Sequence, residues 1–184
     1  MEKAEVNVKK GLEGVIVDVT SISKVMPEIN SLVYKGYPVQ DLAENCCFEE
    51  VEYLLWYGEL PSKSQLEALK KQEVNYRPIS EDLISVIKKF PKYAHPMDTV
   101  RTGVSFLGME DKRVWDSSEK TNFDKSLMMM AKIPTIIAAD YRCRKGLEVI
   151  PPSKDLSFSE NFFHMCFGEV PQKEVVRAFD VSLT

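Results

Sequence analysis

The sequence predicts a mainly α-helical protein with a short two-stranded β ribbon near its N-terminus. Three observations lead to this prediction. After Tyr37, apolar residues recur at the period of an amphipathic helix in one segment after another. Serine, proline and glycine stand where those segments begin and end. Before Tyr37, one stretch instead alternates and is rich in β-branched residues. The 184 residues suit a single domain with a sizeable buried core.

The β ribbon is expected before Tyr37. The stretch GVIVDVTSIS predicts a first strand over residues 15–23, and SLVYKGY predicts a second over residues 31–35. Between them, KVMPEIN contains a proline and an asparagine and is expected to form the turn. Gly36 is expected to close the ribbon.

Four helices are expected in the next part of the chain, and local signals mark their ends. Pro38 suits the first turn of a helix, where no N–H partner is needed. Gly58 is a plausible C-cap, and Ser62 or Ser64 and then Ser80 are plausible N-caps. The four segments are PVQDLAEN, FEEVEYLLWYG, PSKSQLEALKKQEV and ISEDLISVIKKF.

Four more helices complete the expected total of eight. HPMDTVRTGVSFLG predicts a helix over residues 96–107 that ends at Gly108, and the polar residues 109–122 are expected to be a loop. A long helix is expected over residues 123–145. Its middle is apolar nearly all round, which is typical of a helix buried by neighbours on several sides. SFSENFFHMCFG, with a serine N-cap, and PQKEVVRAFDVSLT supply the last two.

Composition and charge argue against several classes of protein. A net charge of −4 with only short basic runs offers no surface for nucleic acid. No segment is long and apolar enough to span a bilayer, and the N-terminus lacks the apolar stretch of a signal peptide. The four cysteines form no CxxC pair, so free thiols are expected rather than a zinc site. We therefore expect a cytoplasmic protein with no nucleic-acid or membrane partner.

His95 is the most prominent candidate for chemistry, because Asp98 and Arg101 follow it at the start of a predicted helix. An imidazole in this position is able to act as an acid, a base or a substrate anchor. The alternative is that His95 only precedes the helix, with its ring bonded to a local carbonyl. Asp98 would then favour the helix dipole and pair with Arg101 one turn later. The sequence alone favours this second interpretation.

The other histidine and the methionine run have simpler structural explanations. His164 lies among large apolar residues in FFHMCF and is expected in the core or at its edge. Met128, Met129 and Met130 suggest a soft metal site. Consecutive helical positions do not point to one spot, however, so the filling of the core is the favoured explanation.

The acidic residues Glu49, Glu50 and Glu52 suggest paired carboxylates, but a helix that begins at Phe48 explains them as first-turn acids that favour the dipole. The sequence contains no glycine-rich phosphate loop, no GxSxG and no HExxH. No residue is therefore assigned as catalytic, cofactor-binding or metal-ligating.

Five stretches in collinear order carry a family resemblance. They are KGLEGVIVDVTSIS, LVYKGYPVQDLAENCCFEEVEYLLWYGELPS, HPMDTVRTGVSFLG, AKIPTIIAADYRCRKGLEVIPP and NFFHMCFGEVPQKEVVRAFDVSLT. Together they resemble the N-terminal half of a bacterial-type citrate synthase, and 2-methylcitrate synthases are similar in the same places. The resemblance implies part of the family's large helical domain over residues 1–184. Residues 1–37 would form an N-terminal arm with the β ribbon and residues 38–184 the helices, and the small domain would be absent.

The resemblance also implies an activity of the tricarboxylic acid cycle. Members of the family condense acetyl-CoA with oxaloacetate to give citrate and CoA, or use propionyl-CoA to give 2-methylcitrate. The segments that carry the family's two active-site histidines and its catalytic aspartate would follow Thr184. We therefore expect this chain to be truncated and inactive alone, with no cofactor or substrate bound by a residue that can be named.

Self-association is a further implication of the resemblance. The helices near residues 96–107 and 123–145 resemble those that pack across the family's dimer interface, so a homodimer is expected through them. The alternative is that these helices are buried within one subunit. The alternative function is a non-catalytic helical dimerisation or interaction module.

Overall fold

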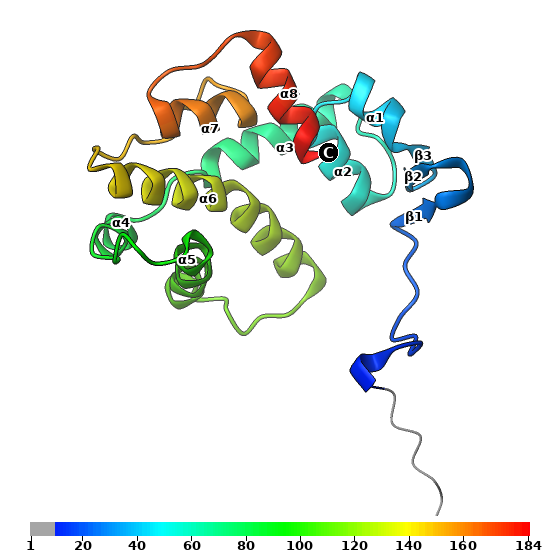
Figure 1. Cartoon of the computed structure of the whole chain (residues 1–184), viewed down its shortest axis with the longest axis horizontal. Helices are drawn as coiled ribbons and strands as arrows, with labels where there is room; N and C mark the ends of the chain where they lie inside the picture. The colour runs from blue at the N-terminus through cyan, green and yellow to red at the C-terminus, as the bar shows by residue number, and fades with distance from the viewer. Residues whose placement is uncertain (1–9) are drawn as a thin grey trace, which may run out of the picture.

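The computed structural model describes residues 10–184, and its longest element is α6 (Glu119–Lys145), a helix of 27 residues. Four helices, α3, α4, α5 and α7, pack against α6, which runs through the helical part of the molecule (Figure 1). Eight α-helices are present in residues 10–184, as the sequence predicts. The other seven are α1 (Val39–Asn45), α2 (Phe48–Tyr57), α3 (Lys63–Tyr76), α4 (Glu81–Ile87), α5 (Pro96–Glu110), α7 (Phe158–Phe167) and α8 (Lys173–Leu183).

The β region differs from the prediction. It is a three-stranded antiparallel sheet in the order β1 (Ser23–Met26), β2 (Ser31–Tyr34) and β3 (Tyr37–Pro38). The second predicted strand is confirmed as β2. The first is wrong, because β1 overlaps it only at Ser23 and otherwise lies in the predicted turn, and residues 15–20 have no strand partner among the described residues.

Two tight connections explain the shift in the sheet. A 3₁₀ turn at Pro27–Ile29 followed by Asn30 in the left-handed region, with φ 50°, places Met26 opposite Ser31. A second turn has Lys35 at φ 48° and Gly36 at φ 92°, so that Gly36 leads into β3 rather than closing the ribbon. The alternating β-branched residues do not by themselves determine which residues pair with β2.

The predicted helix caps are largely confirmed. The hydroxyls of Ser62, Ser80 and Ser157 accept hydrogen bonds from the backbone N–H groups of Gln65, Leu83 and Glu160 at the starts of α3, α4 and α7. Gly58 follows α2 with φ 88° and donates its N–H to the carbonyl of Leu54. These caps satisfy backbone groups that a helix end leaves unpaired.

The predicted boundaries of the two central helices are too short. α5 continues through Gly108 to Glu110, and α6 begins at Glu119 rather than at residue 123. Gly108 therefore does not end its helix, because the chain keeps helical geometry there and Asp111 is the C-cap. No helix within residues 10–184 is both long and apolar enough to cross a membrane.

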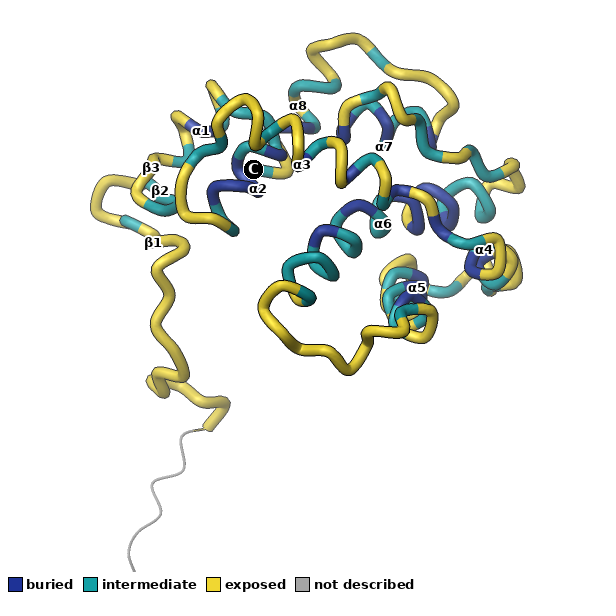
Figure 2. Tube along the Cα trace, turned by 180° about the vertical axis from the view of Figure 1, so that it is seen from behind, coloured by how far each residue is buried: buried dark blue, intermediate teal, exposed yellow. Residues whose placement is uncertain are grey.

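The main apolar core lies where α4, α5 and α6 meet. Ile136 of α6 is fully buried there and faces Gly103 of α5. A Cβ atom on Gly103 would lie 3.0 Å from two side-chain carbons of Ile136, so the glycine permits the close approach of the two helices. Figure 2 shows the buried stretches of α5 and α6 facing each other. The cluster also contains Ile79, Leu83, Ile87, Leu107 and Ala139.

The contact between Gly103 and Ile136 gives a first prediction. Gly103→Ala should lower the free energy of unfolding by about 1–2 kcal/mol relative to Gly108→Ala, because the added methyl group collides with an immobilised side chain. Gly108 is the matched control, since it lies in the same helix and its nearest neighbour to an added Cβ, on Val114, is 4.0 Å away. Both variants gain the same helix propensity. Urea unfolding measures the difference, and equal stabilities would contradict the proposed tight contact.

Candidate functional site

His95 begins α5 and lies at the surface. It is the N-cap residue, and its Nδ1 atom accepts a hydrogen bond of 3.2 Å from the backbone N–H of Met97. Asp98 and Arg101 form an exposed ion pair of 2.9 Å one turn apart. This arrangement agrees with the interpretation as a helix start, although the ring bonds to an N–H group rather than to a carbonyl. The three side chains do not assemble into a catalytic group.

A buried ionic network on α6 fixes the chain before α5. The hydroxyl of Thr99 donates to Asp140 Oδ1 at 2.9 Å, and Arg144 Nε donates to Asp140 Oδ2 at 2.6 Å. Arg144 Nη1 also donates to the carbonyls of Lys92 at 2.9 Å and Ala94 at 2.7 Å. The turn that contains His95 is therefore held to α6 by Arg144.

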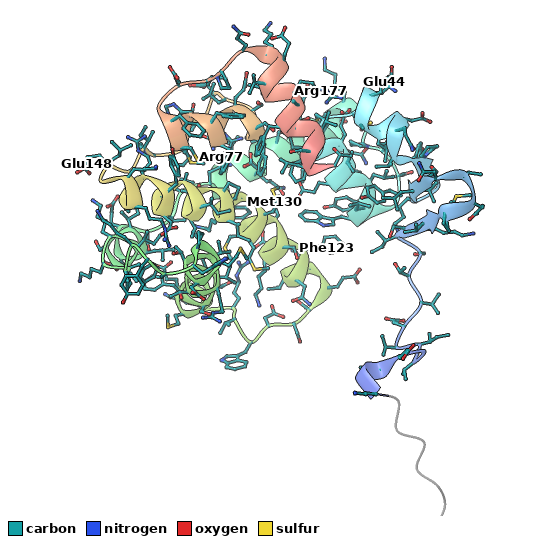
Figure 3. The ribbon with its side chains drawn as sticks, viewed as in Figure 1. Glu44, Arg77, Phe123, Met130, Glu148 and Arg177 are labelled. Atoms are coloured by element: carbon teal, nitrogen blue, oxygen red, sulfur yellow. The ribbon has the colours of Figure 1, made fainter. Side chains whose placement is uncertain are left out.

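His164 and the three methionines have separate environments. His164 is half-buried on α7. Met128 and Met129 line a small hollow between α5 and α6, whereas Met130 (labelled in Figure 3) packs on the cluster of Tyr53, Leu69 and Leu127. In residues 10–184, no group of three or more histidine, cysteine or acidic side chains has a geometry that could hold a metal ion. Packing is therefore confirmed for Met130, whereas Met128 and Met129 lie at the hollow.

The acidic residues of α2 differ from one another. Glu50 completes the helix start, with its Oε2 atom accepting the N–H of Cys47 at 2.8 Å. Glu49 is buried, and its carboxylate lies 3.6 Å from Lys70 Nζ on α3. Glu52 is also buried, yet neither carboxyl oxygen has a hydrogen-bond partner. The prediction of a first-turn acid is therefore wrong for Glu52, which lies in the next turn and faces the protein interior.

The surroundings of Glu52 keep its carboxyl group protonated at neutral pH. Burial, together with repulsion from the nearby Glu49 and Glu73, raises the pKa of Glu52 to about 8. Glu73 belongs to α3 and forms a buried ion pair of 2.7 Å with Arg77. Arg77 therefore pairs with Glu73, and Glu52 has no ion-pair partner among the described residues.

Arg77 connects this acidic cluster to the rest of the fold. Its Nη1 atom donates to the carbonyls of Ser153 and Leu156, each at 2.8 Å, in the loop before α7. The backbone carbonyl of Arg77 accepts a hydrogen bond of 2.8 Å from the hydroxyl of Thr135 on α6. A single buried side chain and its carbonyl thus join α3, α6 and this loop (Figure 3).

An open hollow of about 510 Å³ lies beside this cluster, where the N-terminal ends of α2, α7 and α8 meet α3. Its wall contains both apolar and polar side chains, and several of the polar ones already have structural partners. Arg177 donates to the carbonyls of Ala43, Glu44 and Cys46 at the end of α1. Asp180 accepts from the N–H of Phe48 at 3.2 Å and from the hydroxyl of Ser159 at 2.8 Å.

The thiol at the edge of the hollow is not an activated nucleophile. Burial and the neighbouring Glu49 raise the pKa of Cys47 to about 12, so the thiolate is not populated at neutral pH. The four cysteines are all free. Among the described residues, the wall of the hollow therefore contains anchoring groups and a protonated thiol.

Sequence reasoning missed the buried ionic residues. Glu73 with Arg77 and Asp140 with Arg144 are each four positions apart on one helix, and this spacing was available as a signal. The same spacing is common on exposed helix faces, so it did not indicate burial. Asp180 likewise lies three positions after Arg177, but this spacing did not indicate its partners on α2 and α7, which are distant in sequence.

Comparison with known proteins identifies relatives over nearly the whole chain. Residues 11–184 match the family model described as "Citrate synthase, C-terminal domain". The citrate synthase of Mycolicibacterium smegmatis is 52% identical over 96% of this chain and 47% of its own length. The 2-methylcitrate synthase of Mycobacterium tuberculosis is 50% identical over 96% of this chain and 44% of its own length. The chain thus spans about half the length of the curated relatives it matches.

Solved structures agree with these matches. The crystal structure of citrate synthase from Pyrobaculum aerophilum has a TM-score of 0.88 and 33% identity to this chain. The similarity covers 95% of this chain and 46% of that structure. The arrangement of helices described above is therefore shared with it.

The buried carboxyl of Glu52 gives a second prediction. Since its folded pKa is about 8 and its ordinary value is 4.5, the folded state binds more protons than the unfolded state between these values. The stability that this group contributes is complete below pH 4.5 and is lost as the pH rises towards 8. Glu52→Gln should abolish this pH-dependent contribution, because glutamine does not titrate. The free energy of unfolding of the variant, relative to that of the native chain, should therefore increase by about 2–4 kcal/mol from pH 5 to pH 8.

Urea unfolding across that pH range measures this difference. Glu67→Gln on the exposed side of α3 is the control and should leave the profile unchanged. Parallel profiles for the native chain and Glu52→Gln would show that Glu52 is ionised in the folded protein, contrary to the prediction.

Proposed function

Because the chain belongs to the citrate synthase family, we propose that it forms the helical scaffold of an acyltransferase that condenses acetyl-CoA with oxaloacetate to citrate and CoA. The observation that carries this proposal is the 52% identity to a citrate synthase over 96% of the chain. In the proposed division, residues 1–37 form the N-terminal arm and residues 38–184 the helices of the large domain. The small domain and the substrate pocket belong to the remainder of the whole protein.

The acyl substrate has a second candidate. The relative named 2-methylcitrate synthase is 50% identical, against 52% for the relative named citrate synthase, and this difference does not favour either substrate. Propionyl-CoA is therefore the alternative to acetyl-CoA. The free thiols fit the proposed cytoplasmic location, where cysteines stay reduced.

We propose that the groups needed for turnover lie outside this part of the fold. The condensation needs a base to remove a proton from the acyl group, and donors to stabilise the enol and polarise the oxaloacetate carbonyl. Among the described residues, His95 begins a surface helix and His164 lies on α7, in separate parts of the fold. We therefore propose that the 184-residue chain is inactive alone.

A third prediction concerns this activity. The purified chain, supplied with oxaloacetate and acetyl-CoA or propionyl-CoA, should release no CoA thiol above the rate of a buffer blank. Activity should appear only when the complementary part of the Mycolicibacterium smegmatis relative is produced together with it. Turnover by the chain alone would contradict the proposal. Stable binding of the complementary part without turnover would instead favour the non-catalytic interaction module.

The proposed partner is a second copy that contacts the helices near residues 96–107 and 123–145. An open hollow of about 210 Å³ between α5 and α6 supports this proposal, because its lining is largely apolar and includes Val104, Met128 and Met129. Met109 and Trp115, which are close in sequence to the lining residues Gly108 and Val114, are 76% and 92% exposed. Apolar surface of this kind is typical of an interaction site.

A fourth prediction tests this contact. Val104→Glu should convert the dimer, with twice the chain mass of 21.0 kDa, into a monomer. The dimer contact would bury the introduced carboxylate in the apolar hollow, and the burial of an unpaired charge is costly. Ser105→Glu is the control, since Ser105 is the next residue of α5 and is exposed. Light scattering after size-exclusion chromatography measures the mass, and circular dichroism verifies folding. A dimer that survives Val104→Glu would place the contact elsewhere.

A further inference from the structure

Glu52 of α2 is buried, and its carboxyl group makes no bond. Only 6% of the residue is exposed, and both carboxyl oxygens lack a hydrogen-bond partner among the described residues. A buried polar group without a partner loses its hydration without compensation, and an ionised one loses far more. The packed arrangement of α2 therefore accepts the neutral form of Glu52 and disfavours its carboxylate.

The charged groups next to Glu52 do not offset this cost. On the same helix, Glu49 is buried and lies 3.6 Å from Lys70 Nζ of α3. On α3, Glu73 pairs with Arg77 at 2.7 Å. These two cations are therefore already paired, and the two acidic residues repel a charge on Glu52.

The charged groups of the other elements that meet α2 lie elsewhere or have partners of their own. On α8, Arg177 pairs with Asp180 and donates to carbonyls at the end of α1, and Lys173 lies on the wall of the open hollow, which Glu52 does not line. On α6, the carboxylate of Asp124 is bonded to a tyrosine and an arginine. On α7, Glu160 caps the start of its own helix.

The apolar contacts of α2 are separate from the main core. The buried residues of α2 pack with α1 in one cluster, and with Leu69 of α3 and Leu127 of α6 in another. The cluster of α4, α5 and α6 around Ile136 shares no buried residue with these two. Proteins open locally in contiguous units of this kind. The contact of α2 with α3 is therefore able to open while the core around Ile136 stays packed.

We propose that Glu52 makes the contact between α2 and α3 sensitive to pH: the contact is closed while the carboxyl group is protonated, and it opens locally, with release of that proton, as the pH rises. In the open state the Glu52 carboxylate is hydrated, and α4, α5 and α6 remain packed. This local opening differs from the global unfolding that urea measures. It does not depend on the proposed enzymatic function.

The protonation of Glu52 sets the size of the effect. Its pKa is about 8 in the closed state, and its ordinary value is 4.5. Between these two values the open state releases a proton that the closed state keeps, so the equilibrium constant for opening rises by up to about tenfold per pH unit. From pH 5.5 to pH 7.5 the constant should increase about 50–100-fold, and above pH 8 it should level off.

Amide hydrogen exchange of the 184-residue chain from pH 5.5 to pH 7.5, followed by mass spectrometry, measures this opening. After correction for the intrinsic exchange rate at each pH, the amides of residues 48–57 should lose protection about 50–100-fold. The amides around Ile136 should keep their protection. Glu52→Gln should abolish the loss in residues 48–57, because glutamine does not titrate. Glu67→Gln, on the exposed side of α3, is the matched control and should behave as the native chain does.

Glu52→Leu is a second variant, which removes the buried polar group as well as the charge, and it should also give protection that is independent of pH. Circular dichroism verifies that both variants fold. Unchanged protection of residues 48–57 in the native chain, or an equal loss in the native chain and in the folded variants, would overturn the proposal. An equal loss around Ile136 and in residues 48–57 would also overturn it, because the opening would then be global.

Discussion

The burial of α6 on several sides is the constraint on which the rest of the structure depends. A helix that touches α3, α4, α5 and α7 must be apolar around most of its circumference. Leu127 packs on the α2–α3 cluster, Ile136 on the α4–α5 core, and Ala138 on Met165 of α7. One helix therefore contributes to three separate apolar clusters. The position of each neighbouring helix is set by the apolar side chains that it packs against α6. Gly103 matters because it sets how closely α5 approaches.

Three arginine side chains hold a loop or a helix end to the helical body. Arg77 binds two carbonyls of the loop before α7, and Arg144 binds two carbonyls of the turn before α5. Arg177 does the same for the end of α1. Each guanidinium is accompanied by an acidic residue three or four positions away on its own helix. Burying an unpaired charge is costly. The nearby carboxylate pairs with the guanidinium charge, so the arginine is able to donate several hydrogen bonds to an irregular segment without being an unpaired cation.

Much of the helical fold was predictable, because its signals are local. Serine caps, terminal glycines and the period of the apolar residues each depend on a few neighbouring positions, and Ser62, Ser80 and Gly58 behave as expected. The first strand was misplaced because its position depends on a partner, and that partner is set by the turn at Asn30 rather than by its own composition. The buried state of Glu52 was missed for the same reason, since Glu73 lies on another helix.

The way polar groups are used also bears on why this part of the chain is proposed to be scaffold. A group that takes part in a reaction must keep a lone pair or a proton available to the substrate. His95 has its Nδ1 engaged by a backbone N–H, and Asp180 has its two oxygens engaged by Phe48 and Ser159. Glu52 has a free carboxyl, but it is enclosed by protein and does not line the open hollow. Groups engaged in this way fix the geometry of the helices, and their hydrogen-bonding capacity is used within the protein rather than for a substrate. The engagement of these groups therefore supports the proposal that this part of the chain is scaffold, and the chain spans about half the length of the relatives it matches.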